Sequence, residues 1–340
     1  MDKEVRLALE NKLMTDGFGR VARKLRISIT DRCNMRCVYC MPRNNTEWFE
    51  EDNVLSYDEI LRLTNVFASL GIKKIRLTGG EPTVRPKIEN LIRSLSKVNG
   101  IESISMTTNG LLLYDKVRKL KENGLGSLNI SLDTFRADRF KSMCGIDGLN
   151  KVLASIRAAD DAGLKIKINT VVVRGWNDDE VADFARFARF SGHTVRFIEF
   201  MPLDGAGIWE PDLVFSKREM IERINKNVKE LVPLQNEISE PAILYSFVDG
   251  KGSVGFIPSM TEPFCQHCDR IRITSEGRFL TCLFEKAGYD LKSLLRNTRS
   301  DDDIRRCILE CVRKKPEGVI SIIRARALKP TLNFMHRIGG

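Results

Sequence analysis

The chain lacks a long hydrophobic run. Its longest uncharged stretch, residues 103–114, is polar and too short to cross a bilayer, and the first residues show no apolar segment typical of a signal peptide. These absences predict no membrane partner and a cytoplasmic location. With 340 residues and 42% hydrophobic content, the chain can bury a substantial core, as one large domain with an appendage or as two domains.

Aromatic residues are also scarce. They make up 7% of the chain and are scattered, whereas a nucleic-acid-binding face interleaves aromatics with clustered basic residues. The formal net charge of +10 still predicts an anionic partner, and nucleotide, acidic lipid and nucleic acid all carry the required charge. The scattered aromatics argue against nucleic acid as that partner.

The cysteines do not form a pattern typical of a disulfide framework. There are 9 of them, an odd number, and six fall into two groups of three. This distribution predicts metal ligation in a reducing compartment.

The first group is Cys33, Cys37 and Cys40, which follows a strand-like run at 24–30. A protein-held [4Fe–4S] cluster ordinarily takes four thiolates, so three leave one iron free to bind and activate another molecule. The alternatives are a structural zinc site or thiols that are simply buried. Zinc would need a fourth ligand, and no histidine lies near this loop in the sequence, which favours the cluster.

A second motif, Gly79-Gly80-Glu81-Pro82, follows a strand-like run at 73–78. Two glycines let the backbone approach a ligand closely, and a carboxylate can accept hydrogen bonds from an ammonium group. Alone, such a stretch is more often a turn.

Together the two motifs resemble those of radical S-adenosylmethionine (SAM) enzymes. The resemblance implies that the open iron chelates the amino and carboxylate groups of SAM, which an electron then splits to give a 5′-deoxyadenosyl radical. It also implies a set of residues that bind SAM, each at the end of a strand-like run or in the loop that follows one: Tyr39, Gly80, Ser131 and Met201.

Strand-like runs alternate with helix-like segments over the first two thirds of the chain. This alternation predicts an α/β fold, a partial (βα)6 barrel with its site at the carboxyl ends of the strands. We place the barrel core at 1–203 and a C-terminal extension at 204–340, because the alternation stops near Phe200. The six runs are 25–30, 74–78, 101–107, 127–132, 165–173 and 195–200.

The extension carries the second group, Cys265, Cys268 and the distant Cys282. On spacing alone a zinc ribbon is the more common pattern, with His267 as a conceivable fourth ligand. However, His267 lies inside the turn between two cysteines, where its side chain would tend to point away from a shared metal.

The sequence from Phe264 to Arg272, the distant Cys282 and the terminal Gly339-Gly340 together resemble the GTP 3′,8-cyclases of molybdenum cofactor biosynthesis. The resemblance implies a second [4Fe–4S] cluster, held by the second trio, whose open iron contacts guanine. In this family the radical removes hydrogen from ribose C3′ of GTP, and the carbon radical then attacks guanine C8. It further implies a reductant or electron-donor protein and a homodimer.

The same resemblance assigns a set of residues to GTP, most of them cationic: Arg26, Arg76, Thr107, Lys167, Arg270 and Arg272. Strand alternation puts Lys165 and Lys167 on one face, so the pattern alone leaves both open as phosphate ligands. Gly339 and Gly340 are expected to enter the barrel and assist SAM cleavage. The competing hypotheses are a peptide- or RNA-modifying radical SAM enzyme and a non-enzymatic metal-binding module.

Overall fold

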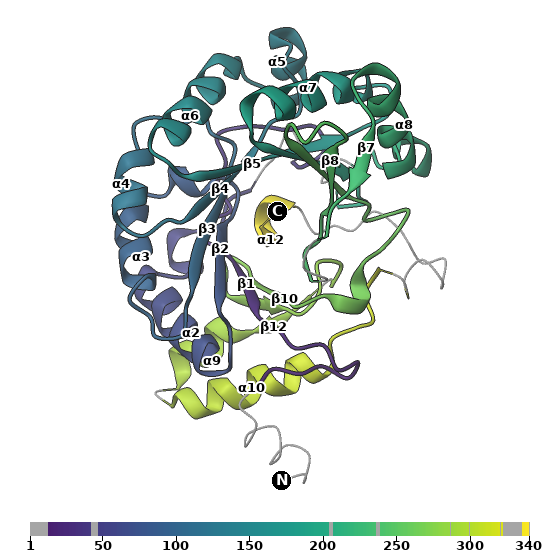
Figure 1. Ribbon diagram of the computed structural model, residues 1–340. Coiled ribbons are helices and arrows are strands. Elements are labelled where there is room, and N and C mark those ends of the chain that lie inside the picture. Colours follow the sequence, from purple (N-terminus) through teal and green to yellow (C-terminus); the bar gives the residue numbers. More distant parts are fainter. Residues whose placement is uncertain are drawn as a thin grey trace.

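The computed structural model describes residues 13–41, 47–203, 207–235, 239–285, 287–298, 300–319, 321 and 335–339. One 12-stranded sheet curves around a central space, in the order β12-β11-β10-β1-β2-β3-β4-β5-β6-β9-β8-β7 (Figure 1). The two edge strands, β12 and β7, do not pair with each other, so the sheet does not close and the barrel is partial, as predicted.

The middle of the sheet is a run of six parallel strands in chain order, each paired with the next. They lie within a residue or two of the predicted runs, which confirms the six units. The strands are β1 (Lys24–Ser28), β2 (Lys74–Thr78), β3 (Ser103–Thr108), β4 (Ser127–Ser131), β5 (Lys165–Val172) and β6 (Thr194–Glu199). The helices between them cover the outside: α2 (Tyr57–Ser69), α3 (Ile88–Leu95), α4 (Val117–Glu122), α5 (Ala137–Cys144), α6 (Leu149–Asp161) and α7 (Val181–Ser191).

The helix boundaries follow from local chemistry. Ser56 caps α2 and exchanges hydrogen bonds with Glu59 in a capping box. The helix ends before Gly71, whose φ of 96° a residue with a side chain rarely adopts. Short 3-10 turns occur at η1 (Glu51–Asn53), η2 (Pro82–Val84), η3 (Asp178–Glu180), η4 (Pro211–Leu213) and η5 (Cys265–His267).

The two faces of the central strands differ in chemistry. Leu25, Ile27, Ile75 and Leu77 are buried against the outer helices and belong to the main hydrophobic core. The alternate positions turn the other way and are largely polar or cationic. In a closed barrel of this kind the interior is ordinarily filled by branched apolar side chains, so a charged interior indicates a ligand-binding space.

The C-terminal half extends this same sheet at both edges. β9 pairs parallel with β6, and β10 pairs parallel with β1, so the chain between them crosses the open side of the barrel. The remaining elements are β7 (Leu231–Pro233), β8 (Ile243–Phe247), β9 (Ser253–Ile257), β10 (Arg270–Ile273), β11 (Arg278–Leu280), β12 (Tyr289–Asp290), α8 (Lys217–Asn227), α9 (Leu291–Asn297), α10 (Asp301–Arg313) and α12 (Met335–Ile338).

The end of the chain returns to the middle of the barrel. Figure 1 shows α12 inside the ring of strands, while α9 and α10 lie outside it near α2. No helix among the described residues is long and apolar enough to cross a membrane.

Candidate active site

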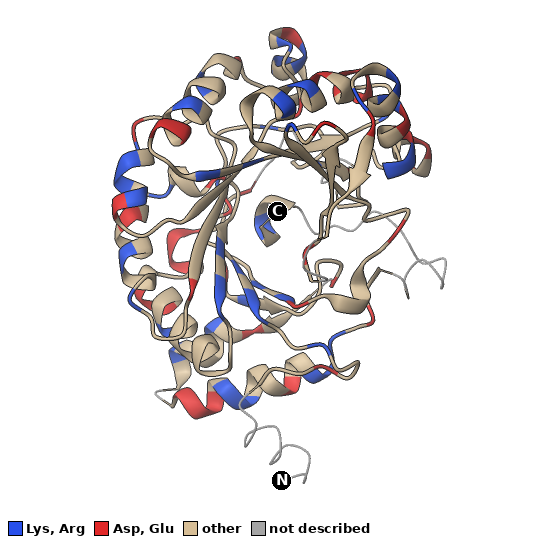
Figure 2. Cartoon of the chain, viewed as in Figure 1, with Lys and Arg blue, Asp and Glu red and all other residues tan. Residues whose placement is uncertain are grey.

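Three arginines from three neighbouring strands stand side by side inside the barrel. Arg26 of β1 pairs in register with Arg272 of β10 on one side and with Arg76 of β2 on the other. Like charges at directly opposed positions repel one another. Figure 2 shows these strands marked by Lys and Arg along the inner wall.

Among the described residues no carboxylate forms a direct ion pair with this row, although the charge of Glu240 raises the pKa of Arg76 and partly offsets the effect of its burial. Burial lowers the pKa of Arg26 well below its ordinary value, and the charges of Arg272 and Arg76 lower it further. Burial and the nearby Arg270 likewise lower the pKa of Arg272 to about 10. A buried cluster of cations is costly unless an anion joins it, so the row is built for an anionic ligand.

Arg196 of β6 adds a further cation from the opposite wall. Its Nε donates to Asn169 Oδ1 at 2.9 Å, and its Nη2 donates to Asn129 Oδ1. Burial, and the charge of Arg76, lower its pKa to about 9. Arg196 and Asn169 were not among the predicted site residues, although the strand alternation that puts Lys165 and Lys167 on one face extends to Asn169.

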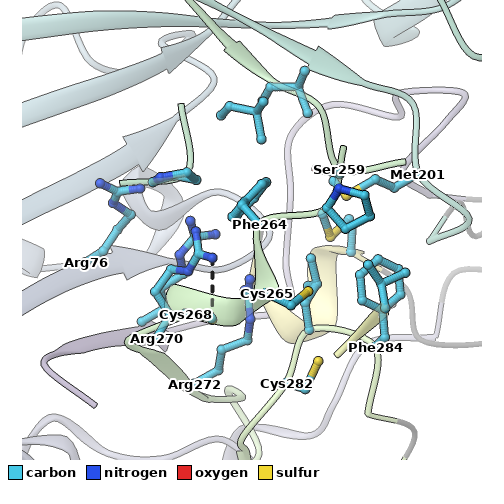
Figure 3. Close-up of a pocket in the computed structure, with 18 of the residues that line it drawn as sticks. Arg76, Met201, Ser259, Phe264, Cys265, Cys268, Arg270, Arg272, Cys282 and Phe284 are labelled. Carbon is cyan, nitrogen blue, oxygen red and sulfur yellow. Dashed lines mark hydrogen bonds between the residues drawn. The ribbon is translucent and has the colours of Figure 1, made fainter. Parts of the chain in front are cut away.

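These side chains line one cavity of about 160 Å³ between the barrel wall and the second cysteine group. Figure 3 shows Arg76, Arg270 and Arg272 on one side, with Phe264, Phe284 and Met201 as apolar and aromatic walls. All the residues predicted to bind GTP line it except Lys167.

Lys167 lies two residues before Asn169 on the same face of β5, level with Asn129 of β4. Asn169 therefore reaches the cavity while Lys167 sits nearer the start of the strand. Burial lowers the pKa of Lys167, as do Arg196 and Arg76, while Glu240 raises it. The Lys167 side chain is exposed and does not line the cavity, although its charge interacts with those of Arg196 and Arg76.

The second cysteine trio forms part of the cavity wall. Cys268 Sγ accepts from Arg270 Nη2 at 3.4 Å, drawn as the dashed line in Figure 3, and from Lys315 Nζ at 3.7 Å. Burial raises the pKa of the Cys268 thiol, but these two cations outweigh it and bring the pKa to about 6. Burial raises the pKa of Cys282, and the neighbouring Cys268 and Cys265 raise it further.

A buried arginine from the start of the chain fixes this loop. Arg20 donates to the carbonyl of Cys265 at 2.8 Å and to the carbonyls of Glu317 and Pro316 at 2.9 and 2.7 Å. Its Nε pairs with Asp16 at 2.6 Å. Neither Arg20 nor Lys315 stands in a motif, so neither could be predicted from the sequence as a residue of this site.

The first trio lies in the loop after β1. Met35 N and Asn109 Nδ2 donate to Cys33 Sγ at 3.4 and 3.8 Å, as donors do around cluster thiolates. Burial, with the negative charge of Glu81, raises the pKa of Cys33 to about 12, and burial raises that of Cys40. Backbone hydrogen bonds join this loop to the end of α5.

Gly79 and Gly80 are required by close backbone packing. A Cβ on Gly79 would lie 2.5 Å from Thr30 O, and one on Gly80 would lie 2.3 Å from Arg32 O. The second motif therefore presses directly on the chain that leads into Cys33. Side chains at either position would displace the cysteine loop.

The Glu81 carboxylate is hydrogen-bonded to the protein itself, and no ammonium group is among its partners in the described contacts. Glu81 is 1% exposed, and its oxygens accept from Thr83 N and Oγ1, from Thr108 Oγ1 at 2.7 Å and from Asn109 N at 2.7 Å. Three of these hydrogen bonds go to Oε1 and one, from Asn109 N, goes to Oε2. Glu81 instead ties the glycine loop to the end of β3.

The residues predicted for SAM lie at strand ends. The Tyr39 hydroxyl donates to Asp133, just after β4, and burial raises the pKa of that carboxyl to about 6. Ser131 closes β4 in register with Asn169. Met201 follows β6 and lines the cavity. The structure thus brings Ser131 and Met201 to the rim above the charged lumen, and Tyr39 beside Cys40.

The tail lies between the two trios. Arg272 donates to the carbonyl of Gly339 at 2.6 Å, and a Cβ on Gly339 would lie 2.4 Å from Thr78 Cγ2. The backbone N–H of His336 donates to the Cys40 thiol. Gly340 lies outside the described residues.

Within the described ranges, no three His, Cys, Asp or Glu side chains converge tightly enough to hold a single metal ion. His267 is exposed, in keeping with the expectation that it points away from the trio.

Two family models divide the chain between them. Residues 27–188 match the radical SAM superfamily, and residues 193–320 match Molybdenum Cofactor Synthesis C. The partial barrel, the three-cysteine loop and the glycine motif agree with the first match. This chain is a radical SAM enzyme, and its cofactors are SAM and an iron–sulfur cluster.

Curated relatives specify the family. A GTP 3′,8-cyclase of Clostridium perfringens (strain SM101 / Type A) is 42% identical over 328 residues, 96% of this chain and 100% of that protein. One of Thermodesulfovibrio yellowstonii is 40% identical over the same shares, and a mitochondrial one of Arabidopsis thaliana is 41% identical over 89% of this chain and 78% of that protein. The chain belongs to the GTP 3′,8-cyclase family.

Solved structures agree on the fold. Streptococcus suis SuiB bound to S-adenosylmethionine matches with a TM-score of 0.61 and 15% identity, over 97% of this chain and 78% of that one. SuiB bound to its precursor peptide SuiA matches with a TM-score of 0.62 and 14% identity, over 89% and 70%. At this identity the likeness concerns the fold alone.

Proposed function

We propose that this chain cyclises GTP to (8S)-3′,8-cyclo-7,8-dihydroguanosine 5′-triphosphate, the first step of molybdenum cofactor biosynthesis, with two [4Fe–4S] clusters. The observation that carries the proposal is the register of Arg272, Arg26 and Arg76, which face one cavity beside the second cysteine trio. A nucleoside triphosphate supplies both the anion that the row requires and a base that can reach the trio.

The two cysteine groups have surroundings that fit iron–sulfur clusters. Cys33, Cys37 and Cys40 would hold the first cluster and Cys265, Cys268 and Cys282 the second. Donors to sulfur are present in both loops, and Gly318 leaves room at Cys265, where an added Cβ would lie 2.6 Å from Sγ. With SAM on its open iron, the first cluster supplies the 5′-deoxyadenosyl radical that abstracts hydrogen from the substrate.

The chain's own residues bind and orient. Arg26, Arg76, Arg270 and Arg272 would neutralise the phosphates, with Thr107 at the cavity wall and Lys167 near the start of β5. Arg196, held by two asparagines, is added to this set. Phe264 and Phe284 offer aromatic surfaces that exclude water near the base.

Tyr39, Gly80, Ser131 and Met201 remain our proposed SAM contacts. Gly80 follows β2 and packs against the loop that leads into Cys33, Ser131 ends β4, Met201 follows β6, and Tyr39 lies in the cysteine loop itself. We retain the division into a core at 1–203 and an extension at 204–340; the two family matches support a division into two parts but meet earlier, between residues 188 and 193.

Partners follow from the chemistry. Radical generation takes one electron per SAM, so a reductant or electron-donor protein is required, and the family resemblance supports a homodimer. Nucleic acid and membranes have no part in this proposal, which agrees with a cytoplasmic location. Size-exclusion chromatography with light scattering tests the dimer.

The test is an anaerobic incubation of reconstituted protein with SAM, reductant and GTP deuterated at C3′. We expect deuterium to appear in 5′-deoxyadenosine and a cyclised product to form, with ATP as the control nucleotide. If SAM is cleaved but no deuterium is transferred and no GTP is consumed, the proposed substrate is wrong while the radical SAM chemistry is right.

A further inference from the structure

Lys315 is a buried cation aimed at the second cysteine trio. It is 4% exposed, and its Nζ lies 3.7 Å from Cys268 Sγ, 2.9 Å from Cys268 O and 3.0 Å from Arg270 O. These contacts use the three donors of an ammonium group. Among the described residues no carboxylate forms an ion pair with it, so its charge lacks a buried counterion there.

The position of Lys315 is fixed from several sides. It follows α10, and its own N–H donates to Val312 O at 2.9 Å. The next residues are tied by Arg20, which bonds the carbonyls of Pro316 and Glu317 and that of Cys265 together. Gly318 then packs so closely on Cys265 that a Cβ would lie 2.7 Å from that residue's Cβ.

The turn 315–318 is therefore one wall of the second cysteine site. Three thiolates around an iron–sulfur core leave the site net negative, and reduction adds another negative charge. A fixed ammonium with an N–H···S contact stabilises the reduced form more than the oxidised form, because the attraction grows with the negative charge. A buried cation without a carboxylate partner is in turn stabilised by a negative cluster.

We propose that Lys315 is the buried counter-charge of the second cluster and raises its reduction potential, with Arg20 and Gly318 holding the turn that carries it. The inference rests on the proposed second cluster of this chain. Arg270 also contacts Cys268, but it lines the cavity and is shared with the ligand. In the described contacts, Lys315 Nζ reaches only the Cys268 thiol and the backbone carbonyls of Cys268 and Arg270, so its effect is on the cluster itself.

The test isolates the second cluster. In a Cys33→Ala/Cys37→Ala/Cys40→Ala background, the redox titration of the remaining cluster is followed by electron paramagnetic resonance. Lys315→Met and Lys315→Gln should shift its potential to lower values, while Lys315→Arg stays near the parent. Lys314→Met, which removes the adjacent exposed lysine, is the matched control and should not shift it.

A full iron content with an unchanged potential in both neutral variants would overturn the inference. If the neutral variants lose iron while Lys315→Arg keeps it, with circular dichroism unchanged, the positive charge is needed for the cluster and the inference stands. If Lys315→Arg loses iron equally, the residue only packs. Should the parent background hold zinc or no iron, the two-cluster proposal itself has failed, which is a separate result.

Discussion

Cys33 and Cys40 lie in surroundings that disfavour a thiolate, whereas Cys268 lies between two cations. Burial and the charge of Glu81 raise the pKa of Cys33 to about 12. Burial also raises the pKa of Cys268, but Arg270 and Lys315 overcome it and lower the pKa to about 6. Cys33 and Cys268 thus have opposite electrostatics, whereas the pKa of Cys282 in the second trio is raised, like that of Cys33.

The difference follows from what surrounds each loop. The first loop packs against the glycine motif and α5, which supply backbone contacts and a buried carboxylate. The second loop leads directly into β10, where Arg272 belongs to the arginine row and Arg270 lines the same cavity. The second site is therefore coupled electrostatically to the ligand cavity, while the first depends on its own iron to stabilise its thiolates.

Removing one cysteine from each trio tests this separation most strongly. Cys40→Ala should abolish 5′-deoxyadenosine formation, because the iron that binds SAM is lost. Cys268→Ala should retain SAM cleavage and lose only the cyclised product, as measured by liquid chromatography with mass spectrometry. Cys307→Ala, a half-buried cysteine on α10 outside both trios, is the control. Loss of SAM cleavage in Cys268→Ala would show that the sites are not separable.

The tail joins the two sites, and one methyl group should disturb it. In Gly339→Ala the new Cβ would meet Thr78 Cγ2 at 2.4 Å, at a φ of +78°. We expect turnover to fall severely while the iron content of the reconstituted protein stays unchanged. Gly192→Ala has a φ of +76° and nothing within 4 Å, so it imposes the same backbone strain without the collision. Equal turnover in the two variants would mean that Gly339 is only a chain end.

Much of this arrangement could be predicted from local sequence. Strand periodicity placed all six parallel strands, and Gly71 marked the end of α2. The cysteine spacing and the paired glycines identified the first loop. Each of these signals depends on neighbours in the chain, so no knowledge of the tertiary structure was needed.

The rest depends on contacts between distant segments. The row of Arg272, Arg26 and Arg76 exists only because β10 returns to pair with β1, a register that periodicity does not encode. Lys315 and Arg20 reach the second trio through turns without a motif. The sequence alone also could not reveal that Thr108 and Asn109 at the end of β3 donate to the Glu81 carboxylate.

Arg26→Ala tests whether the row serves the ligand or the fold. Losing one charge-assisted phosphate contact should weaken GTP binding by roughly 1.5–3 kcal/mol, which is roughly 10- to 150-fold in affinity. The apo protein should be as stable or more stable, because repulsion from Arg272 and Arg76 is relieved. Calorimetric titration and thermal unfolding measure the two effects, and Arg157→Ala on the exposed face of α6 is the control. Unchanged affinity with lower stability would assign the row to the fold.

The thiols of the apo protein offer the finest comparison of the two loops. A thiol with a pKa of about 6 is mostly thiolate near neutral pH, and only the thiolate is nucleophilic, whereas Cys33 stays protonated. Iodoacetamide at about pH 7 should therefore modify Cys268 well before Cys33, as read by peptide mass spectrometry.

Arg270→Ala removes one of the two cations, so the pKa of Cys268 rises and its modification slows. Because the pKa of Cys268 rises in the variant, its modification rate falls most at about pH 6–7, where the parent thiol is ionised and the variant thiol is not. It fades towards about pH 9, where both are ionised. Arg157→Ala should leave the profile unchanged. Equal rates for Cys33 and Cys268 at neutral pH would remove the electrostatic distinction between the trios and leave only their positions to separate them.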